Sequence, residues 1–80
     1  MDMKSVAIIL NPEKSEAVKL ACTIVPWLHE RGVSIVAEHD AATAMSSPSL
    51  SRDEEQLAKA DFALVMGGDG TLLRASRIMA

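Results

Sequence analysis

The sequence predicts an α/β fold, in which a parallel sheet of at least three strands is flanked by helices. Three short apolar runs carry this prediction, because continuous apolar runs are typical of strands that are buried on both faces. Segments with helical character separate the runs, and this alternation of strand and helix is typical of a parallel sheet with crossover connections. The three runs are residues 5–10, 33–37 and 61–66.

The first run, residues 5–10, is rich in β-branched residues and is expected to be the central strand. Asn11 and Pro12 follow it, and they predict the start of a helix, because asparagine is a preferred N-cap and proline is tolerated at the first helical position. Apolar residues then recur at helical spacing as far as Leu28. Gly32 is expected to end this helix. Two residues near its apolar face, Cys22 and Trp27, are expected to be buried packing residues.

The second run, residues 33–37, is expected to form a short strand, which places Glu38 at its carboxyl end. Residues 41–48 are small and include a proline, so this stretch predicts a loop. Ser51 and Glu54 match a capping box, in which each side chain bonds the backbone of the other, and they predict a short helix over residues 52–59.

The third run leads into a glycine-rich acidic turn, and a helix is expected from residue 72 onward. Glycines in the turn let the backbone approach another molecule closely, and the amides at the start of the helix suit an anion. A phosphate cradle gains nothing from a carboxylate, so Asp69 is expected to accept a proton or to bind a metal. A plain connecting turn is the alternative, and the motif is neither a Walker A loop nor the dinucleotide G-x-G-x-x-G. The turn reads Gly67-Gly68-Asp69-Gly70-Thr71.

Asn11 and the glycine-rich turn are expected at the same edge of the sheet if the first and third strands are neighbours. In open α/β sheets, ligands bind outside the carboxyl ends of the strands. Asn11 is therefore a candidate ligand-binding residue, although a capping role would explain it equally well.

Composition excludes several classes of function. A net charge of −3 argues against nucleic acid as a partner, and an aromatic content of 2% argues against base stacking. The single cysteine, Cys22, cannot form an internal disulfide. Residues 1–4 show no basic-then-apolar leader, and no apolar run is long enough to span a membrane, so a cytoplasmic protein without membrane partners is expected.

The turn Gly67-Gly68-Asp69-Gly70-Thr71, preceded by an apolar strand that opens with an aspartate, resembles the signature of the NAD kinase family. Diacylglycerol and sphingosine kinases belong to the same superfamily. The continuation Leu72-Leu73-Arg74-Ala75 resembles the NAD kinase branch, whereas lipid kinases place an Asn-Glu pair soon after the threonine. The order of elements resembles the family over most of the chain, but only residues 61–77 carry a specific motif.

The resemblance implies ATP-dependent phosphorylation of NAD at the 2′-hydroxyl of its adenosine ribose, which gives NADP. Asp69 matches the family's general base, which would take the proton of the hydroxyl. Leu73 matches a position that lines the dinucleotide pocket, and a core leucine is the equal alternative. A divalent metal, usually Mg²⁺, is expected with ATP, and no residue can be assigned as its ligand. The expected nucleotide-binding residues are Gly67, Gly68, Gly70, Thr71, Leu73 and Asn11.

The resemblance also implies a domain organisation. Residues 1–80 correspond to a Rossmann-like N-terminal domain, and the family's β-rich C-terminal domain, which completes the NAD pocket, has no counterpart here. The helical pattern runs to Ala80 without a cap, so we expect an incomplete N-terminal domain that is inactive alone. Members of the family are commonly oligomeric, and open sheet edges agree with this, so a homo-oligomer is expected. The alternatives are a lipid-kinase fragment and a non-catalytic module that binds nucleotide or self-associates.

Overall fold

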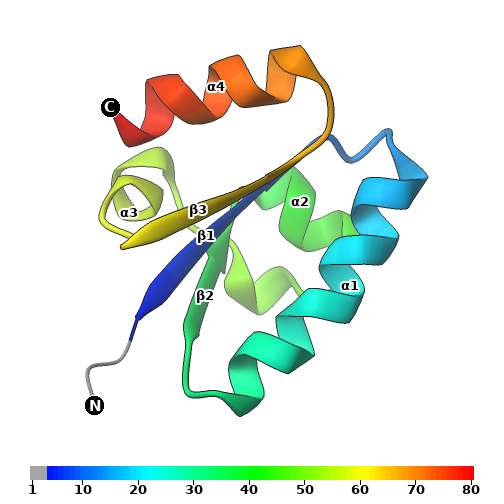
Figure 1. Ribbon diagram of the computed structural model, residues 1–80, viewed down its shortest axis with the longest axis vertical. Helices are drawn as coiled ribbons and strands as arrows, with labels where there is room; N and C mark the ends of the chain where they lie inside the picture. The colour runs from blue at the N-terminus through cyan, green and yellow to red at the C-terminus, as the bar shows by residue number, and fades with distance from the viewer. Residues whose placement is uncertain (1–3) are drawn as a thin grey trace.

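The computed structural model describes residues 4–80 as a three-stranded parallel sheet with helices on both faces (Figure 1). Residues 1–3 lie outside the described residues, and so does most of the N-terminal stretch, residues 1–4, in which the sequence shows no leader. The predicted α/β fold is confirmed. The elements are β1 (Ser5–Leu10), α1 (Ser15–Glu30), β2 (Ser34–Ala37), α2 (His39–Ala44), the 3-10 turn η1 (Pro48–Leu50), α3 (Glu54–Ala58), β3 (Phe62–Met66) and α4 (Asp69–Met79).

The sheet has the strand order β2-β1-β3, so β1 is the central strand, as its apolar sequence predicts. Ser5 pairs with Ser34 of β2, and Val6 pairs with Phe62 of β3, both in parallel register. Four residues of β1, from Ala7 to Leu10, are completely buried. A strand with two neighbours and two covered faces needs an apolar residue at every position, which explains the uninterrupted run.

Two apolar clusters lie on opposite faces of the sheet, and the alternating side chains of β1 divide between them. On one face, Ile8 and Leu10 pack with the alanines of α1 and α2. On the other face, Ile9 packs with Leu57 of α3 and with Ile78 of α4. Figure 1 shows this division, with α1 and α2 on one side of the sheet and α3 and α4 on the other.

The two outer edges of the sheet differ. The edge of β2 is partly covered, because Ser51 forms a parallel bridge with Ala37 and the Arg52 amide donates to the Ala37 carbonyl at 2.9 Å. No strand among residues 4–80 pairs with the outer edge of β3, where Phe62 is 57% exposed. Of the open sheet edges that the sequence predicts, only the edge of β3 is fully open among residues 4–80.

Helix α1 differs from its prediction at its start and at its surface. It begins at Ser15 with Lys14 as the N-cap residue, so Asn11 and Pro12 belong to the preceding loop. The predicted end is confirmed, because Gly32 has the left-handed φ of +77°.

Cys22 and Trp27 are exposed, so their predicted burial was wrong. Arg31 stacks on the Trp27 ring, with its guanidinium carbon 3.7 Å from the ring centroid. Among residues 4–80, no helix combines the length and the apolar character needed to cross a membrane.

Two further local predictions were wrong. Part of the predicted loop over residues 41–48 is helix α2, whose Ala41 and Ala42 are buried against the sheet. The N-cap of α3 is Asp53, whose Oδ1 accepts a hydrogen bond from the Gln56 amide at 2.9 Å. Ser51 does not cap α3, because its backbone is engaged at the edge of β2.

Candidate functional site

The carboxyl ends of β1 and β3 lie side by side, so Asn11 and the glycine-rich turn share one rim of the sheet, as predicted. Leu10 pairs with Met66 in the parallel register, and the Asn11 amide donates to the Met66 carbonyl oxygen at 3.0 Å. The turn begins at the next residue, Gly67. Ligands in open α/β sheets bind at this rim, which makes it the candidate site.

Gly67 cannot be replaced by a larger residue without movement of its neighbours. Its φ of +149° lies in a region that L side chains rarely adopt. A Cβ at this position would lie 2.6 Å from the Oγ1 of Thr71 and 3.1 Å from the Cβ of Asn11. Thr71 is only 4% exposed, so it has little room to move. The close fit of Gly67, Thr71 and Asn11 fixes the turn against the end of β1.

Helix α4 begins earlier than the sequence predicts. Gly68 is its N-cap residue, and Asp69 is its first helical residue, so the acidic part of the motif forms the first turn of the helix. The amides of Thr71 and Leu72 both donate to the Gly68 carbonyl. The amides of Asp69 and Gly70 precede these bonds, and such leading amides have no acceptor within their own helix. A Cβ built at Gly68 or Gly70 meets no atom within 4 Å, so the space beside both is open.

Asp69 presents a free carboxylate at this rim. The residue is exposed, and its side chain makes no hydrogen bond or ion pair within residues 4–80. All its lone pairs are therefore available to accept hydrogen bonds from an incoming molecule. Its place on the first turn of a helix fixes its backbone.

Leu73 lies on the outer face of α4 and is 70% exposed, so the alternative role of a core leucine is wrong within this structure. Ala75 and Ile78 form the packing face of the same helix. An exposed leucine next to an open turn is suited to contact with an apolar or flat molecule, which leaves the predicted pocket-lining role as an open prediction.

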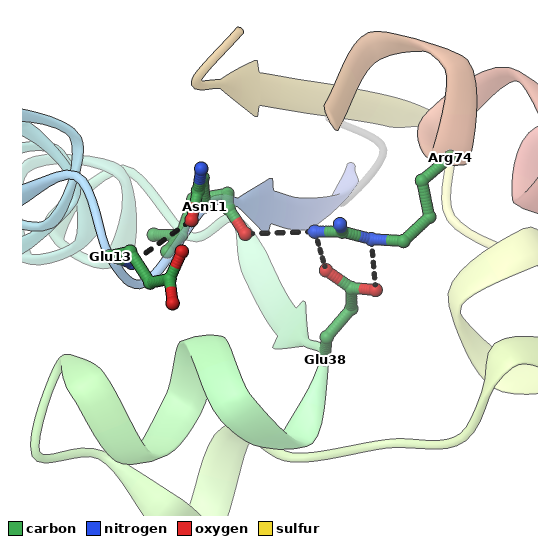
Figure 2. A network of polar contacts seen from close by, with 5 residues as sticks. Asn11, Glu13, Glu38 and Arg74 are labelled. Carbon is green, nitrogen blue, oxygen red and sulfur yellow. Dashed lines mark hydrogen bonds and ion pairs between the residues drawn. The ribbon is translucent and has the colours of Figure 1, made fainter. Parts of the chain in front are cut away.

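The side chain of Asn11 closes its own loop and does not cap a helix. Its Oδ1 accepts a hydrogen bond from the Glu13 amide at 3.0 Å, an Asx-type turn that Figure 2 shows. The Nδ2 of Asn11 makes no bond within the described part of the chain, and it remains available as a donor at the rim.

Two clefts open at this end of the sheet. One, of about 450 Å³, lies next to the turn and is lined by Gly67, Leu20 and the exposed Lys14, among others. Lys14 contributes an ammonium group to this cleft and Glu16 contributes a carboxylate, so charged groups of both signs lie beside Gly67. The other cleft, of about 470 Å³, lies beyond the ends of β1 and β2 and is lined by Arg74 and Glu38, among others.

Arg74 and Glu38 form a side-chain pair that the sequence reasoning missed. The Nε of Arg74 donates to one carboxylate oxygen of Glu38 and an NH2 donates to the other, each at 3.0 Å. The two residues are 36 positions apart, so no local pattern indicates their contact. Figure 2 shows the pair beside Asn11, with Arg74 reaching across from α4.

The described residues do not form a metal centre. Between Lys4 and Ala80, no group of three or more histidine, cysteine, aspartate or glutamate side chains is placed to hold a metal ion. Asp69 offers one carboxylate at the open turn, and Mg²⁺ in nucleotide sites commonly uses one or two carboxylates with the substrate phosphates. A metal that arrives bound to a nucleotide is compatible with this arrangement.

Comparison with known protein families supports the reading of the motif. The family model for the ATP-NAD kinase N-terminal domain matches residues 6–80. Similar curated proteins include the NAD kinase of Moorella thermoacetica, which is 35% identical over 78 residues. Those of Acidobacterium capsulatum and Francisella tularensis subsp. novicida are each 35% identical, over 79 and 77 residues.

The similarity covers nearly all of this chain but a minor part of each relative. The matched region is 98% of this chain and 25% of the Moorella protein, 98% and 28% for Acidobacterium, and 94% and 26% for Francisella. The chain thus spans about a quarter of the length of the curated relatives that it matches. No solved structure gives a significant match.

Proposed function

The chain belongs to the ATP-NAD kinase N-terminal domain family, and from this premise we propose that it serves an NAD kinase as its N-terminal α/β domain, residues 1–80. The reaction is the ATP-dependent phosphorylation of the 2′-hydroxyl on the adenosine ribose of NAD, which gives NADP. A β-rich C-terminal domain would complete the NAD pocket. The name of the relatives supports the reaction, and the geometry of the rim supports the place where it occurs.

The observation that carries this proposal is the unpaired carboxylate of Asp69 on the first turn of α4, between two glycines whose surroundings are open. A hydroxyl is a weak nucleophile, so a carboxylate within hydrogen-bond reach can take its proton while the oxygen attacks phosphorus. The carboxylate of Glu38 is unsuited to this task, because both of its oxygens already accept hydrogen bonds from Arg74.

The proposed step is an in-line displacement. The 2′-oxygen of NAD forms a bond to the γ-phosphorus of ATP, the bond between that phosphorus and the β,γ-bridging oxygen breaks, and ADP leaves. The carboxylate of Asp69 accepts the hydroxyl proton. Positioning and charge neutralisation supply most of the catalysis in phosphoryl transfer, and the free amides of Asp69 and Gly70 are suited to hold phosphate oxygens.

The remaining motif residues have supporting roles in this proposal. Gly67, Gly68 and Gly70 let the backbone approach the nucleotide, and Thr71 holds the turn in shape through its contact with Gly67. Leu73 contacts the dinucleotide from its exposed place on α4. Asn11 contributes its free Nδ2 as a donor. Mg²⁺ bound to the phosphates of ATP would supply charge neutralisation, and no residue of this chain is assigned as its ligand.

The proposal extends to assembly and location. The unpaired edge of β3 and the exposed Phe62 support a homo-oligomer or a covering segment at that edge. A cytoplasmic location agrees with small soluble nucleotides as the substrates. The 80 residues alone are proposed to be inactive, because they hold only one side of the cleft.

The proposal is tested on the product of the complete gene. Incubation with NAD, ATP and Mg²⁺ is expected to give NADP, measured with an NADP-specific dehydrogenase. Asp69→Asn should abolish most of this activity, while Glu55→Gln, a change at an exposed carboxylate on α3, should leave it intact. Diacylglycerol and sphingosine are tested in parallel. A well-folded product that phosphorylates a lipid and not NAD would overturn the proposal in favour of a lipid kinase.

A further inference from the structure

The central strand extends farther at the rim than its neighbour β2. The pairing of β1 with β2 ends at Ile8 and Ala37, whereas its pairing with β3 continues to Leu10 and Met66. After Ala37 the chain leaves the sheet and enters α2 at His39. The last part of β1 therefore has a strand on one side only.

This mismatch leaves one backbone carbonyl without a strand partner. The amide of Asn11 donates to the Met66 carbonyl, so it points toward β3. The N–H and C=O of a trans peptide point in opposite directions, so the carbonyl of Leu10, in the same peptide, points toward the side where β2 has ended. An orphaned carbonyl at a partly buried strand end lowers stability unless a donor reaches it.

Arg74 supplies that donor. Its NH2 group donates to the Leu10 carbonyl at 2.9 Å, and the guanidinium also holds both carboxylate oxygens of Glu38. Glu38 is the N-cap residue of α2, directly after β2. One side chain thus connects α4, the end of β1 and the junction of β2 with α2 (Figure 2).

We propose that Arg74 is a positioning residue, which holds the first turn of α4, and with it Asp69, at a fixed place relative to the end of β1. The proposal rests on the proposed function. Ala75 and Ile78 attach the helix to the sheet through apolar contacts, which are not directional. The bidentate bonds of Arg74 are directional, so they resist a slide or rotation of the helix.

The competing role for Arg74 is direct contact with a nucleotide phosphate. Its side chain is 34% exposed and lines the cleft beyond β1 and β2. However, its Nε and one NH2 group already donate to Glu38 and Leu10. Positioning requires Glu38 as much as Arg74, whereas phosphate binding requires Arg74 alone. This difference separates the two roles.

The test compares Arg74→Gln, Glu38→Gln and the double variant in the product of the complete gene. Each single change is expected to lower kcat by about 10- to 100-fold, because small misplacements of reacting groups have large effects on rate. The KM values for ATP and NAD should change by less than about threefold. The double variant should be no worse than the poorer single variant, since both remove the same unit.

Matched controls are Arg77→Gln and Arg74→Lys. Arg77 lies on the same helix, is exposed and makes no bond within the described residues, so its loss should leave kcat unchanged. Lysine cannot reproduce the fork of an arginine and should restore little of the lost rate. A rise in KM for the Arg74 variants without one for Glu38→Gln would overturn the proposal in favour of phosphate contact. Unchanged kcat in both single variants would overturn it outright.

A readout without catalysis keeps this inference separate from the proposed function. Amide hydrogen exchange at Thr71 and Leu72, which bond to the Gly68 carbonyl, should be about tenfold faster in Arg74→Gln than in Arg77→Gln. Exchange at Ile8 and Ile9 serves as the internal reference for global unfolding. A wild-type protein that makes no NADP would contradict the proposed function, and equal exchange in the two variants would contradict the positioning role.

Discussion

Two acidic residues follow the two outer strands of the sheet at the same rim, and their side chains differ in burial and in hydrogen bonding. Glu38 follows β2, is 19% exposed at its side chain, and has both oxygens bonded to Arg74. Asp69 follows β3 after two glycines, is exposed, and has no side-chain partner within residues 4–80. A bonded carboxylate holds structure, whereas a free one can accept a proton. The comparison predicts that changes at Glu38 alter stability and, through the position of α4, turnover, whereas changes at Asp69 alter turnover with little effect on stability.

The largest effect is expected for Asp69→Asn. Loss of a general base lowers kcat by about 10²–10⁴-fold. This corresponds to an increase of roughly 3–5 kcal/mol in the activation free energy. The free energy of unfolding of the 80-residue chain should change by less than about 0.5 kcal/mol, because no bond is lost. Turnover of the complete gene product and urea unfolding of the chain measure the two quantities. Near-normal turnover in the variant would remove Asp69 from the role of base.

Gly67→Ala should have the next largest effect, because the added Cβ meets Thr71 at 2.6 Å and the φ is unfavourable for alanine. We expect a loss of about 2–4 kcal/mol in the free energy of unfolding. Gly70→Ala is the matched control. It lies in the first turn of α4 with open space around it, so alanine should stabilise the chain by about 0.5–1 kcal/mol. Equal effects at the two glycines would contradict the close fit at the turn.

Glu38→Gln should destabilise the chain by about 1–2 kcal/mol, because a charge-assisted bidentate pair is reduced to neutral bonds at a partly exposed place. The loss should shrink in high salt, which already weakens the ionic part of the pair. Urea unfolding at low and high ionic strength measures both. Stability equal to that of the wild type would indicate that the pair with Arg74 contributes little.

The smallest effect concerns a third acidic residue, Asp53, which caps α3 through the Gln56 amide. Asp53→Ala should lower the free energy of unfolding by about 1 kcal/mol, the usual effect of a lost N-cap. Glu54→Ala, at the next and also exposed position, should lower it less, because Glu54 makes no capping bond in this structure. A larger loss at Glu54 would favour the capping box that the sequence alone suggested.

Much of the fold could be predicted because its signals are local. The three strands are continuous apolar runs, and the end of α1 is set by the left-handed Gly32. Helix α2 was missed because its buried face consists of alanines, whose small side chains give no strong periodic pattern. The start of α1 was misplaced because Asn11 bonds the nearby Glu13 amide and so closes a turn of its own.

The candidate site was predictable in its motif but not in its surroundings. The sequence places the glycines and Asp69 after a strand, and the neighbouring position of Asn11 followed from the expected strand order. The contact of Arg74 with Glu38 depends on where β2 ends relative to β1, which is a property of the register. Register is decided by packing across the whole sheet, so residues 36 positions apart give no sign of it in the sequence.

The long separation of β1 from β3 also has a consequence during synthesis. Ser5 bonds Asp61 across 56 residues, so β1 cannot complete its pairing until β3 has left the ribosome. At translation rates of about 5–20 residues per second, this interval is roughly 3–11 seconds. During this interval, one edge of the most buried strand stays open to chaperones or to another nascent chain. Slow codons between β2 and β3 would therefore lengthen the period in which this protein can aggregate, without any change in its final stability.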